Sequence, residues 1–260
     1  MVGNTSKRLE LRFIKTVTDS YKEQMAIDEA NMLAVAQGIA KPTFRICYFK
    51  KPSVAIGYFQ SVEEEVNLKA CNSLGVEIFR RMTGGGAVFK DPEKELNYSI
   101  IIPEEFAPGT IINSYEKLCA GIVLGLKHLG LNAEFKPVND IIISGKKVSG
   151  NAQTRFKGVI LQHGTLLIDV DVDKMFSLLK VSDEKIKDKM IANVKQRVTS
   201  LKHELGFKPS FEAVEQCLIK GFEQALNAKI IPEELTSFEK RKIIELYNNK
   251  YNTHAWNFKR

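Results

Sequence analysis

Three consecutive glycines, Gly84 to Gly86, separate two short apolar segments and limit the possible folds more than any other feature of the sequence. Glycine adopts positive φ freely and lets backbone approach a ligand, but ordering it costs more entropy than ordering any other residue. A plain turn needs only one or two glycines, and here Arg80 and Arg81 add positive charge just before the run. The segment therefore favours an anion-binding loop between two strands. A glycine-rich hairpin with both arginines in solvent is the alternative.

Two further segments carry residues suited to chemistry. Residues 139–153 join an Asn-Asp pair through an apolar strand to a Gly-Lys-Lys hairpin, whose lysine could stabilise a phosphoryl group or developing carboxylate charge. Such a hairpin, taken alone, is more often a solvated turn. Residues 161–167 place His163 between apolar neighbours, where it can line a pocket or be hydrogen-bonded in the core. The nucleotide-binding patterns GxxxxGK[ST] and GxGxxG are both absent from the sequence.

The hydrophobic periodicity alternates between strands and helices along the chain. It predicts strands at 9–17, 44–49, 54–59, 76–81 and 96–102, strands and tight turns over 140–169, and helices at 21–37, 62–74, 114–129, 172–179, 211–226 and about 234–249. No flexible linker interrupts residues 9–250. We therefore expect a single mixed α/β (α+β) domain over residues 1–260, with a C-terminal helical cap at about 206–260.

Composition excludes several classes of protein. The first twelve residues are polar and basic, unlike a signal peptide, and no apolar run reaches the length of a membrane span. The four cysteines lack CxxC spacing, which argues against a zinc site and fits a reducing, cytoplasmic location. The net charge of +7 favours acidic partners. Because the charge is spread along the chain, we expect neither nucleic acid nor a membrane as a partner.

Read together and in order, these segments resemble the lipoate-protein ligase family, within the superfamily of biotin/lipoate ligases and octanoyltransferases. The matching stretches are RRMTGGGAVFKD (80–91), LNYSI (96–100), NDIIISGKKVSGNAQ (139–153), HGTLL (163–167) and a C-terminal Tyr-x-x-Lys-Tyr-x-Thr-x-x-Trp-Asn pattern (247–257). The resemblance implies mixed, largely antiparallel sheets flanked by helices, in the biotin/lipoate ligase-like (class II synthetase-like) fold.

The resemblance also implies an ATP-dependent lipoate-protein ligase. Such an enzyme activates lipoate to lipoyl-AMP, with Mg²⁺ expected to screen the triphosphate. It then transfers the lipoyl group to a lysine of a lipoyl carrier domain, in a 2-oxoacid dehydrogenase E2 or a glycine cleavage H protein. ATP, Mg²⁺ and lipoate are therefore the expected ligands.

The resemblance assigns roles to residues position by position. The set expected to contact the nucleotide and its phosphates comprises Arg81, Gly85, Gly86, Ala87, Val88, Phe89, Asn139 and Asp140, with Asp140 as the metal contact. Lys147 matches the catalytic lysine at the acyl-phosphate junction. His163 and Gly164 match the wall around the acyl chain.

Two features depart from the family pattern. Many relatives have histidine after GGGAVF, where this chain has Lys90, so the role of Lys90 stays open. The chain also stops soon after Trp256, where ligases of the bacterial type continue into an accessory domain. It resembles the large catalytic domain of the archaeal bipartite type, and we expect a separate small accessory protein as a partner.

Three other functions compete with the ligase. An octanoyl or lipoyl transferase needs no ATP and acts through a cysteine thioester, but residues 131–146, just ahead of the lysine strand, contain no cysteine. A biotin ligase would carry a GRGRxG-like loop where this chain has RRMTGGGAV. A carrier- or nucleotide-binding module without activity would only bind more weakly after Lys147→Ala, whereas an enzyme would lose adenylation.

Overall fold

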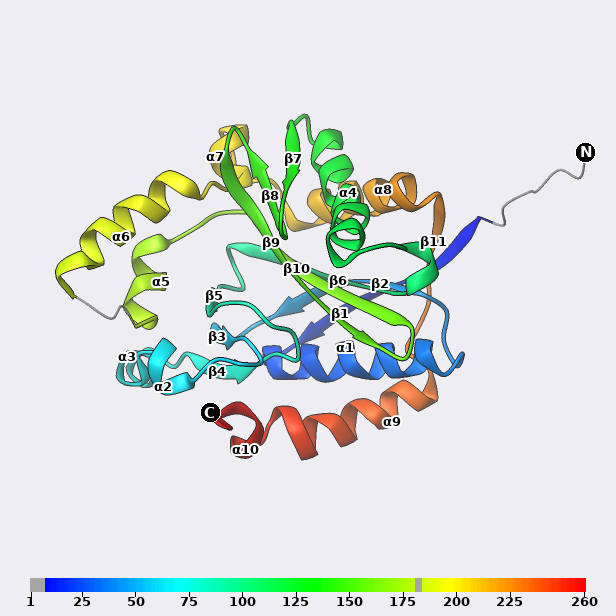
Figure 1. The fold of residues 1–260 in the computed structure, drawn as a ribbon, viewed down its shortest axis with the longest axis horizontal. Helices are drawn as coiled ribbons and strands as arrows, with labels where there is room; N and C mark the ends of the chain where they lie inside the picture. Colours follow the sequence, from blue (N-terminus) through cyan, green and yellow to red (C-terminus); the bar gives the residue numbers. More distant parts are fainter. Residues whose placement is uncertain (1–7, 181–183) are drawn as a thin grey trace, which may run out of the picture.

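An eight-stranded sheet organises the computed structural model, which describes residues 8–180 and 184–260 (Figure 1). Its strands, in spatial order, are β11 (Ala228–Pro232), β1 (Leu9–Thr18), β2 (Thr43–Phe49), β6 (Glu95–Pro103), β10 (Val159–Leu167), β9 (Lys146–Phe156), β8 (Asp140–Ile143) and β7 (Ala133–Lys136). Strands β11, β1 and β2 are parallel, and every other neighbouring pair is antiparallel. A smaller sheet contains β4 (Glu77–Arg80), β3 (Ser53–Ile56) and β5 (Val88–Lys90).

Two helix layers cover the large sheet (Figure 1). The helices α4 (Ile111–His128) and α8 (Phe211–Leu226) pack on one face, and α1 (Tyr21–Ala36) and α9 (Ser237–Leu246) lie on the other. Because side chains alternate along a strand, Ile100 of β6 joins the core beneath α4 and α8, while Ile101 packs toward α1. A Cβ on Gly221 would lie 2.2 Å from the carbonyl oxygen of Gly121, so glycines let α4 and α8 cross closely.

The remaining helices are short or lie at one end of the large sheet. They are α2 (Val62–Glu65), α3 (Leu68–Ser73), α5 (Val172–Leu178), α6 (Glu184–Arg197), α7 (Leu201–Leu205), α10 (His254–Asn257), a 3₁₀ turn (Glu104–Phe106) and a π-helical turn (Tyr247–Tyr251). Figure 1 shows α5 and α6 projecting beyond the helix layers, on the side where β5 lies. No helix in the described part of the chain is long and apolar enough to cross a membrane.

The expected fold class is confirmed, since the large sheet is mixed, mostly antiparallel and flanked by helices. The helix predicted at 211–226 has those bounds. Three differences from the predicted elements appear. The predicted helix 62–74 is broken at Val66, which bridges to Leu179. Strand β7 was not predicted, and no bounds were predicted for helices α6 and α7. Strand β11 lies inside the predicted C-terminal helical cap, where it pairs with β1.

A buried ion pair attaches α9 to the sheet. Arg12 of β1 donates to both carboxylate oxygens of Glu239 on α9, the Nη1–Oε2 distance being 2.8 Å. Asn31 of α1 donates to the same carboxylate at 2.7 Å, and Thr43 accepts from Arg12 Nε at 2.6 Å. The sheet, α1 and α9 are thus joined through one carboxylate. Charged groups this deeply buried persist only when paired and hydrogen-bonded.

Candidate active site

A cavity of about 440 Å³ opens where the smaller sheet meets the end of the large sheet. The triple-glycine loop and β5 line it on one side, and β9 and β10 line it on the other. Its volume lies within the range of about 300–1,000 Å³ that is typical of small-molecule sites. The two motifs singled out in the sequence, at 80–91 and 139–153, therefore border one cavity.

The buried arginine Arg81 holds the triple-glycine loop in place. Nη2 of Arg81 donates to the carbonyl oxygens of Gly84 (3.0 Å) and Gly86 (2.8 Å), and burial lowers the pKa of its guanidinium to about 10. Arg80 donates to the carbonyl oxygen of Gly57 at 2.9 Å and points away from the cavity lining toward the C-terminal segment. Both guanidinium groups therefore act on the backbone. The expectation that the adjacent arginines present charge to a ligand is weakened, since the guanidinium of Arg81 already has carbonyl partners.

Lys147 lies on the opposite wall, beside Asp140. A two-residue turn, in which Ser144 and Gly145 both have positive φ, connects β8 to β9 and sets the two side chains next to each other. The Nζ atom of Lys147 is 2.6 Å from Oδ1 of Asp140, and both side chains are partly exposed. The pair gives the cavity an ammonium group with a fixed position.

Gly150 makes room for the Lys147 side chain. A Cβ at this position would lie 2.9 Å from both Cε and Nζ of Lys147. We therefore expect Gly150→Ala to displace the ammonium group from Asp140 without unfolding the protein, because the long lysine side chain can move. Displacement by about 1 Å can slow catalysis by up to about 100-fold. We expect a loss of about 10- to 100-fold in the turnover rate at an unchanged thermal midpoint, measured by steady-state kinetics and calorimetry. A lowered thermal midpoint in Gly150→Ala, together with the lower turnover rate, would show instead that Gly150 is needed for folding.

Asn139 positions this strand pair by bonding to backbone. Its Nδ2 donates to the carbonyl oxygen of Asn151 at 2.5 Å, and Nδ2 of Asn151 donates back to the carbonyl oxygen of Asn139 at 2.9 Å. The hydroxyl of Tyr98 donates to Oδ1 of Asn151 at 2.7 Å. A Cβ on Gly164 would lie 2.1 Å from that same oxygen, so only glycine fits there. These contacts hold β8, β9 and β10 in register behind Lys147.

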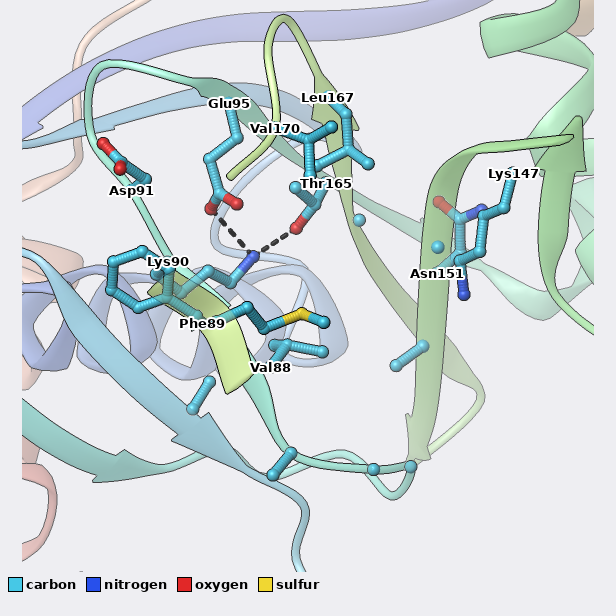
Figure 2. Close-up of a pocket in the computed structure, with 18 of the residues that line it drawn as sticks. Val88, Phe89, Lys90, Asp91, Glu95, Lys147, Asn151, Thr165, Leu167 and Val170 are labelled. Carbon is cyan, nitrogen blue, oxygen red and sulfur yellow. Dashed lines mark hydrogen bonds and ion pairs between the residues drawn. The ribbon is translucent and has the colours of Figure 1, made fainter. Parts of the chain in front are cut away.

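Lys90 is buried in a polar cluster at the base of the cavity (Figure 2). Its Nζ lies 3.2 Å from the carboxylate of Glu95, donates to Oδ1 of Asn97 at 2.7 Å and also contacts Thr165. Burial lowers the pKa of Lys90 and raises the pKa of Glu95, and the attraction between the two groups only partly offsets this effect. Figure 2 shows the Lys90 amine turned toward Glu95 and Thr165, far from Lys147. Lys90 therefore forms part of the cavity floor.

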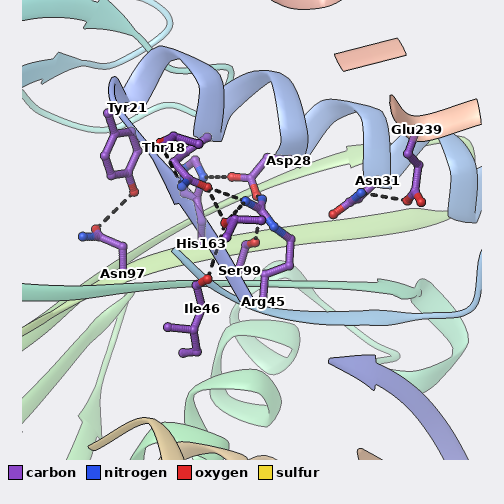
Figure 3. Close-up of polar contacts among 12 residues, drawn as sticks. Thr18, Tyr21, Asp28, Asn31, Arg45, Ile46, Asn97, Ser99, His163 and Glu239 are labelled. Carbon is purple, nitrogen blue, oxygen red and sulfur yellow. Dashed lines mark hydrogen bonds and ion pairs between the residues drawn. The ribbon is translucent and has the colours of Figure 1, made fainter. Parts of the chain in front are cut away.

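His163 joins the loop to α1 through a buried network (Figure 3). Its Nδ1 is 3.0 Å from Oδ2 of Asp28, and its Nε2 is 2.8 Å from the hydroxyl of Thr83, the residue before the triple glycine. Asp28 is also paired with the guanidinium of Arg45. Burial lowers the pKa of His163 despite the opposing effect of Asp28. The neutral ring thus donates from Nδ1 to Asp28 and accepts at Nε2 from Thr83.

This network makes stability depend on pH in a defined direction. Because the pKa of His163 is lowered below its ordinary value of 6.5, the unfolded chain binds a proton more readily than the folded one. Stability from the neutral ring is therefore present above pH 6.5 and is lost as pH falls below it. One such group contributes a slope of at most about 1.4 kcal/mol per pH unit. We expect His163→Gln to flatten the fall in unfolding free energy as the pH decreases from 6.5 toward the range in which carboxylates ordinarily titrate.

Burial alone would raise the pKa of Asp28, but Arg45 and His163 outweigh that effect and lower it. The contribution of Asp28 is therefore present above its ordinary pKa of 3.8 and is lost as pH falls through its lower folded-state value, outside the window for His163. The measurement is urea unfolding of the wild-type protein and of His163→Gln over the pH range in which His163 titrates. An unchanged slope in the glutamine variant would contradict the prediction.

The rest of the cavity is mainly apolar. Side chains from the small sheet, α1, the end of β10 and the segment after it, α5, α6 and the residue after α6 form this wall: Met25, Ala55, Phe79, Val88, Leu167, Val170, Val172, Met175, Val194 and Val198. An alkyl chain would bury its surface here at a gain of about 0.8 kcal/mol per CH₂. The site therefore combines a hydrophobic wall with lysine ammonium groups held by carboxylates, among them Lys147 beside Asp140 and Lys94 beside Asp171.

The structure brings together nearly all the residues that the sequence singled out. Arg81, Gly85, Gly86, Ala87, Val88, Phe89, Asn139, Lys147, His163 and Gly164 line the cavity. Asp140, the expected metal contact, lies behind Lys147 and pairs with it. Within residues 8–180 and 184–260, no group of three or more His, Cys, Asp or Glu side chains is arranged to hold a metal. The individual roles of the predicted residues stay predictions.

Sequence reasoning missed the residues that support the site. Four such residues lie far in sequence from their partners. Two of them, Asp28 and Arg45, support the triple-glycine loop through His163, and the other two, Tyr98 and Asn151, hold the strands behind Lys147. The only available signal was a charged or amide side chain inside an otherwise apolar segment, as with Arg45 in 43–49 and Asp28 in 21–36. Such a residue indicates a buried polar partner without identifying it.

Comparison with known proteins places this site in a family. Residues 20–223 match the model of the lipoyl protein ligase A/B catalytic domain. The octanoyltransferase LipM of Kyrpidia tusciae is 34% identical, with 96% of this chain and 98% of that protein covered. LipM of Geobacillus kaustophilus is 35% identical over 91% and 93% of the two chains. Among solved structures, a bipartite lipoate protein ligase from Thermoplasma acidophilum, described with its E2 lipoyl domain, is 32% identical with a TM-score of 0.87, and 96% of each chain is covered.

These relatives correct the predicted activity. Curated relatives that align with nearly the whole chain are named octanoyltransferases, so the prediction of an ATP-dependent, adenylate-forming ligase is wrong, and ATP and Mg²⁺ are not supported as its ligands. The ATP-independent transferase, kept above as an alternative, agrees better with these names. The resemblance itself is confirmed. Because residues 20–223 match the family model and a 34% identical relative aligns with 96% of this chain, the chain belongs to the family of lipoyl protein ligase A/B catalytic domains.

Proposed function

We propose that the protein transfers an octanoyl or closely related acyl group from an activated donor to a lysine of a lipoyl carrier domain, without ATP. The observation that carries the proposal is the placement of Lys147 across a largely apolar cavity from the triple-glycine loop. The names of the full-length relatives support octanoyl as the acyl group. The Thermoplasma ligase, which is described together with an E2 lipoyl domain, supports the acceptor.

Lys147 would act on the acyl carbonyl group. In acyl transfer, negative charge develops on the carbonyl oxygen when an amine attacks the carbonyl carbon. The Lys147 ammonium can donate a hydrogen bond to that oxygen, and Asp140, 2.6 Å away, fixes its position. Because the position is set before the substrate arrives, little reorganisation is needed during the reaction.

The apolar wall would select the acyl chain. A saturated chain of medium length makes no hydrogen bonds, and the valines, methionines and leucine of the wall offer none. The charged groups at the base of the cavity, Lys90 and Glu95, already satisfy one another. The chain would therefore lie against the wall while its carbonyl group remains near Lys147.

The acceptor would approach from solvent. An excess of positive charge, +7 over the chain, favours encounter with an acidic carrier domain. Whether that carrier is an E2 or an H protein, whether a separate accessory protein takes part, and the cytoplasmic location all remain predictions from the sequence.

Incubation of the protein with an octanoyl thioester of a phosphopantetheine carrier and a purified lipoyl domain tests the proposal. We expect mass spectrometry to find one octanoyl group on the lipoyl-domain lysine, with no nucleotide present. The matched control is a lipoyl domain whose acceptor lysine is replaced by arginine. Modification that appears only with free octanoate and ATP would overturn the proposal.

A further inference from the structure

We infer that three residues outside the cavity, Arg80, Trp256 and Asn257, are positioning residues for acyl transfer, because they hold the segment 57–60 against the triple-glycine loop. The inference deepens the proposed function and rests on it. It also gives a role to the C-terminal motif at 247–257. The structure describes all of that motif, and none of its residues lines the cavity. Its effect on the reaction must therefore pass through other residues.

Arg80 fixes the path of the segment 57–60. The residue is completely buried at the end of β4. Its Nη1 donates to the carbonyl oxygens of Gly57 (2.9 Å), Tyr58 (3.1 Å) and Gln60 (2.7 Å). All three acceptors belong to the turn that follows β3. A planar guanidinium with five N–H donors can bind this many carbonyl groups while still donating elsewhere, which a lysine ammonium cannot.

The C-terminal segment holds Arg80 from the other side. The Oδ1 of Asn257 accepts from the backbone N–H of Arg80 at 2.9 Å, and Nε1 of Trp256 donates to the Arg80 carbonyl oxygen at 3.0 Å. The guanidinium donates in turn to the carbonyl oxygens of Trp256 and Asn257, both at 3.2 Å. Asn257 is itself buried and donates to the carbonyl oxygens of Tyr251 and Thr253. Figure 1 shows α10, which contains Trp256 and Asn257, beside β4.

The turn that precedes α10 is fixed relative to the cavity wall. Tyr251 and Lys250 both donate to Oε2 of Glu29 on α1, at 2.5 and 2.6 Å. Tyr251 also packs in one apolar cluster with Tyr21 and Phe79, which line the cavity. The C-terminal segment therefore has a defined position against the site before it binds Arg80.

The segment 57–60 is in direct contact with the triple-glycine loop. A Cβ on Gly57 would lie 1.9 Å from the carbonyl oxygen of Gly85, so the two backbones touch. The backbone N–H of Tyr58 donates to the carbonyl oxygen of Thr83 at 2.9 Å. The side chain of Gln60 accepts from the N–H of Gly57 at 2.8 Å, which stabilises the turn. Because Gly85 lines the cavity, the contacts of Arg80 are passed on to the site.

The loop needs this outer support. Gly85 and Gly86 lie between β4 and β5 and are exposed, and glycine is the residue whose backbone is hardest to order. On the inner side Arg81 binds two carbonyl groups of the loop. On the outer side Gly57 limits how far the loop can move. Because the loop lies across the cavity from Lys147, its position sets the space in which the acyl carbonyl is held.

Asn257→Ala tests the inference in the octanoyl-transfer assay. The change removes the acceptor for the Arg80 N–H and leaves the cavity lining unchanged. We expect the turnover rate per folded molecule to fall about 10- to 100-fold, and the Michaelis constant for the donor to change less than about threefold, because the loop moves while most of the apolar wall remains. Circular dichroism gives the folded fraction, since lost stability alone does not slow the molecules that stay folded. Asn252→Ala, at an exposed position of the same segment, is the matched control and should keep its turnover rate.

Gly57→Ala disturbs the same contact from the opposite end. Its methyl group must push the segment 57–60 away from Gly85, so we expect a loss of turnover of similar size. The double variant Gly57→Ala with Asn257→Ala should be little slower than the slower single variant, because both changes act through one contact. A residue that serves only the stability of the fold would not produce this dependence.

Trp256→Phe keeps the test decisive if Asn257→Ala fails to fold. It removes only the indole N–H donated to Arg80 and keeps an aromatic ring in place. We expect turnover to fall by about threefold to tenfold, the effect of losing one hydrogen bond.

Full turnover in a folded Asn257→Ala or Trp256→Phe protein would overturn the inference, as would single losses that multiply in the double variant. Both results would leave the proposed function intact, since the wild-type protein would still transfer the octanoyl group. Absence of any transfer by the wild-type protein would instead refute the proposed function, and the inference with it.

Discussion

Replacing Lys147 by alanine is expected to slow acyl transfer by about 100- to 1,000-fold, the usual cost of losing one donor to a developing oxyanion. The effect should fall on the turnover rate more than on the Michaelis constant, since the hydrogen bond strengthens as charge develops on the carbonyl oxygen. Steady-state kinetics with the octanoyl thioester donor and a lipoyl domain makes the measurement. Lys147→Arg should recover little, because a planar guanidinium cannot occupy the place of the ammonium group beside Asp140.

Lys146→Ala is the matched control for Lys147. The two lysines are neighbours on β9, but only Lys147 lines the cavity that contains the triple-glycine loop. We expect the control variant to keep its turnover rate. If both variants lose activity equally, general positive charge rather than a positioned ammonium group would account for catalysis. Full activity of Lys147→Ala would remove the central support of the proposed function.

Replacing Arg45 by alanine is expected to lower the free energy of unfolding by about 3–5 kcal/mol, the range for breaking a buried ion pair by removing one partner. Arg45 is completely buried, pairs with Asp28 and donates to Thr16 at 3.1 Å and to Gln24 at 2.5 Å. Its loss leaves the Asp28 carboxylate without its principal counter-ion. Urea unfolding followed by circular dichroism measures the change.

The control for Arg45 is the ion pair of Asp19 and Lys50, in which both side chains are largely exposed. Lys50→Ala should leave the unfolding midpoint unchanged, because water and salt screen such pairs. A double variant, Asp28→Ala with Arg45→Ala, should cost less than the two single variants added together, since the partners are in direct contact. Additive losses would show that the two charges do not depend on each other.

Elements with strong local patterns were predictable from the sequence. Helix α8 has an apolar stripe, begins after the N-cap Ser210 and ends at Asn227 in the left-handed conformation, so its bounds followed from local signals. Strand β11 has only five residues and pairs with a strand more than two hundred residues earlier. No local pattern reports such a partner, and the segment was therefore assigned to a helical cap.

The same distinction holds for the site. The triple glycine and Lys147 were found because glycine runs and hairpin lysines are visible in short segments. Their meeting in one cavity was implied only by the family resemblance, and the structure shows it. The use of Arg81 to bind backbone carbonyls, and of Lys90 to pair with Glu95, depended on three-dimensional neighbours. A charged residue in the sequence does not by itself reveal whether its side chain contacts a ligand or another group of the protein.

The buried Arg12–Glu239 pair has a consequence for synthesis on the ribosome. Arg12 emerges from the ribosome 227 residues before its carboxylate partner Glu239, and more than two hundred residues before the strand β11 that pairs with β1. Until then the nascent sheet has an open edge and an uncompensated guanidinium in its interior. An unpaired strand edge is a site for association with other chains. Nascent chains that stall before residue 228 should therefore depend on chaperones to stay free of aggregates.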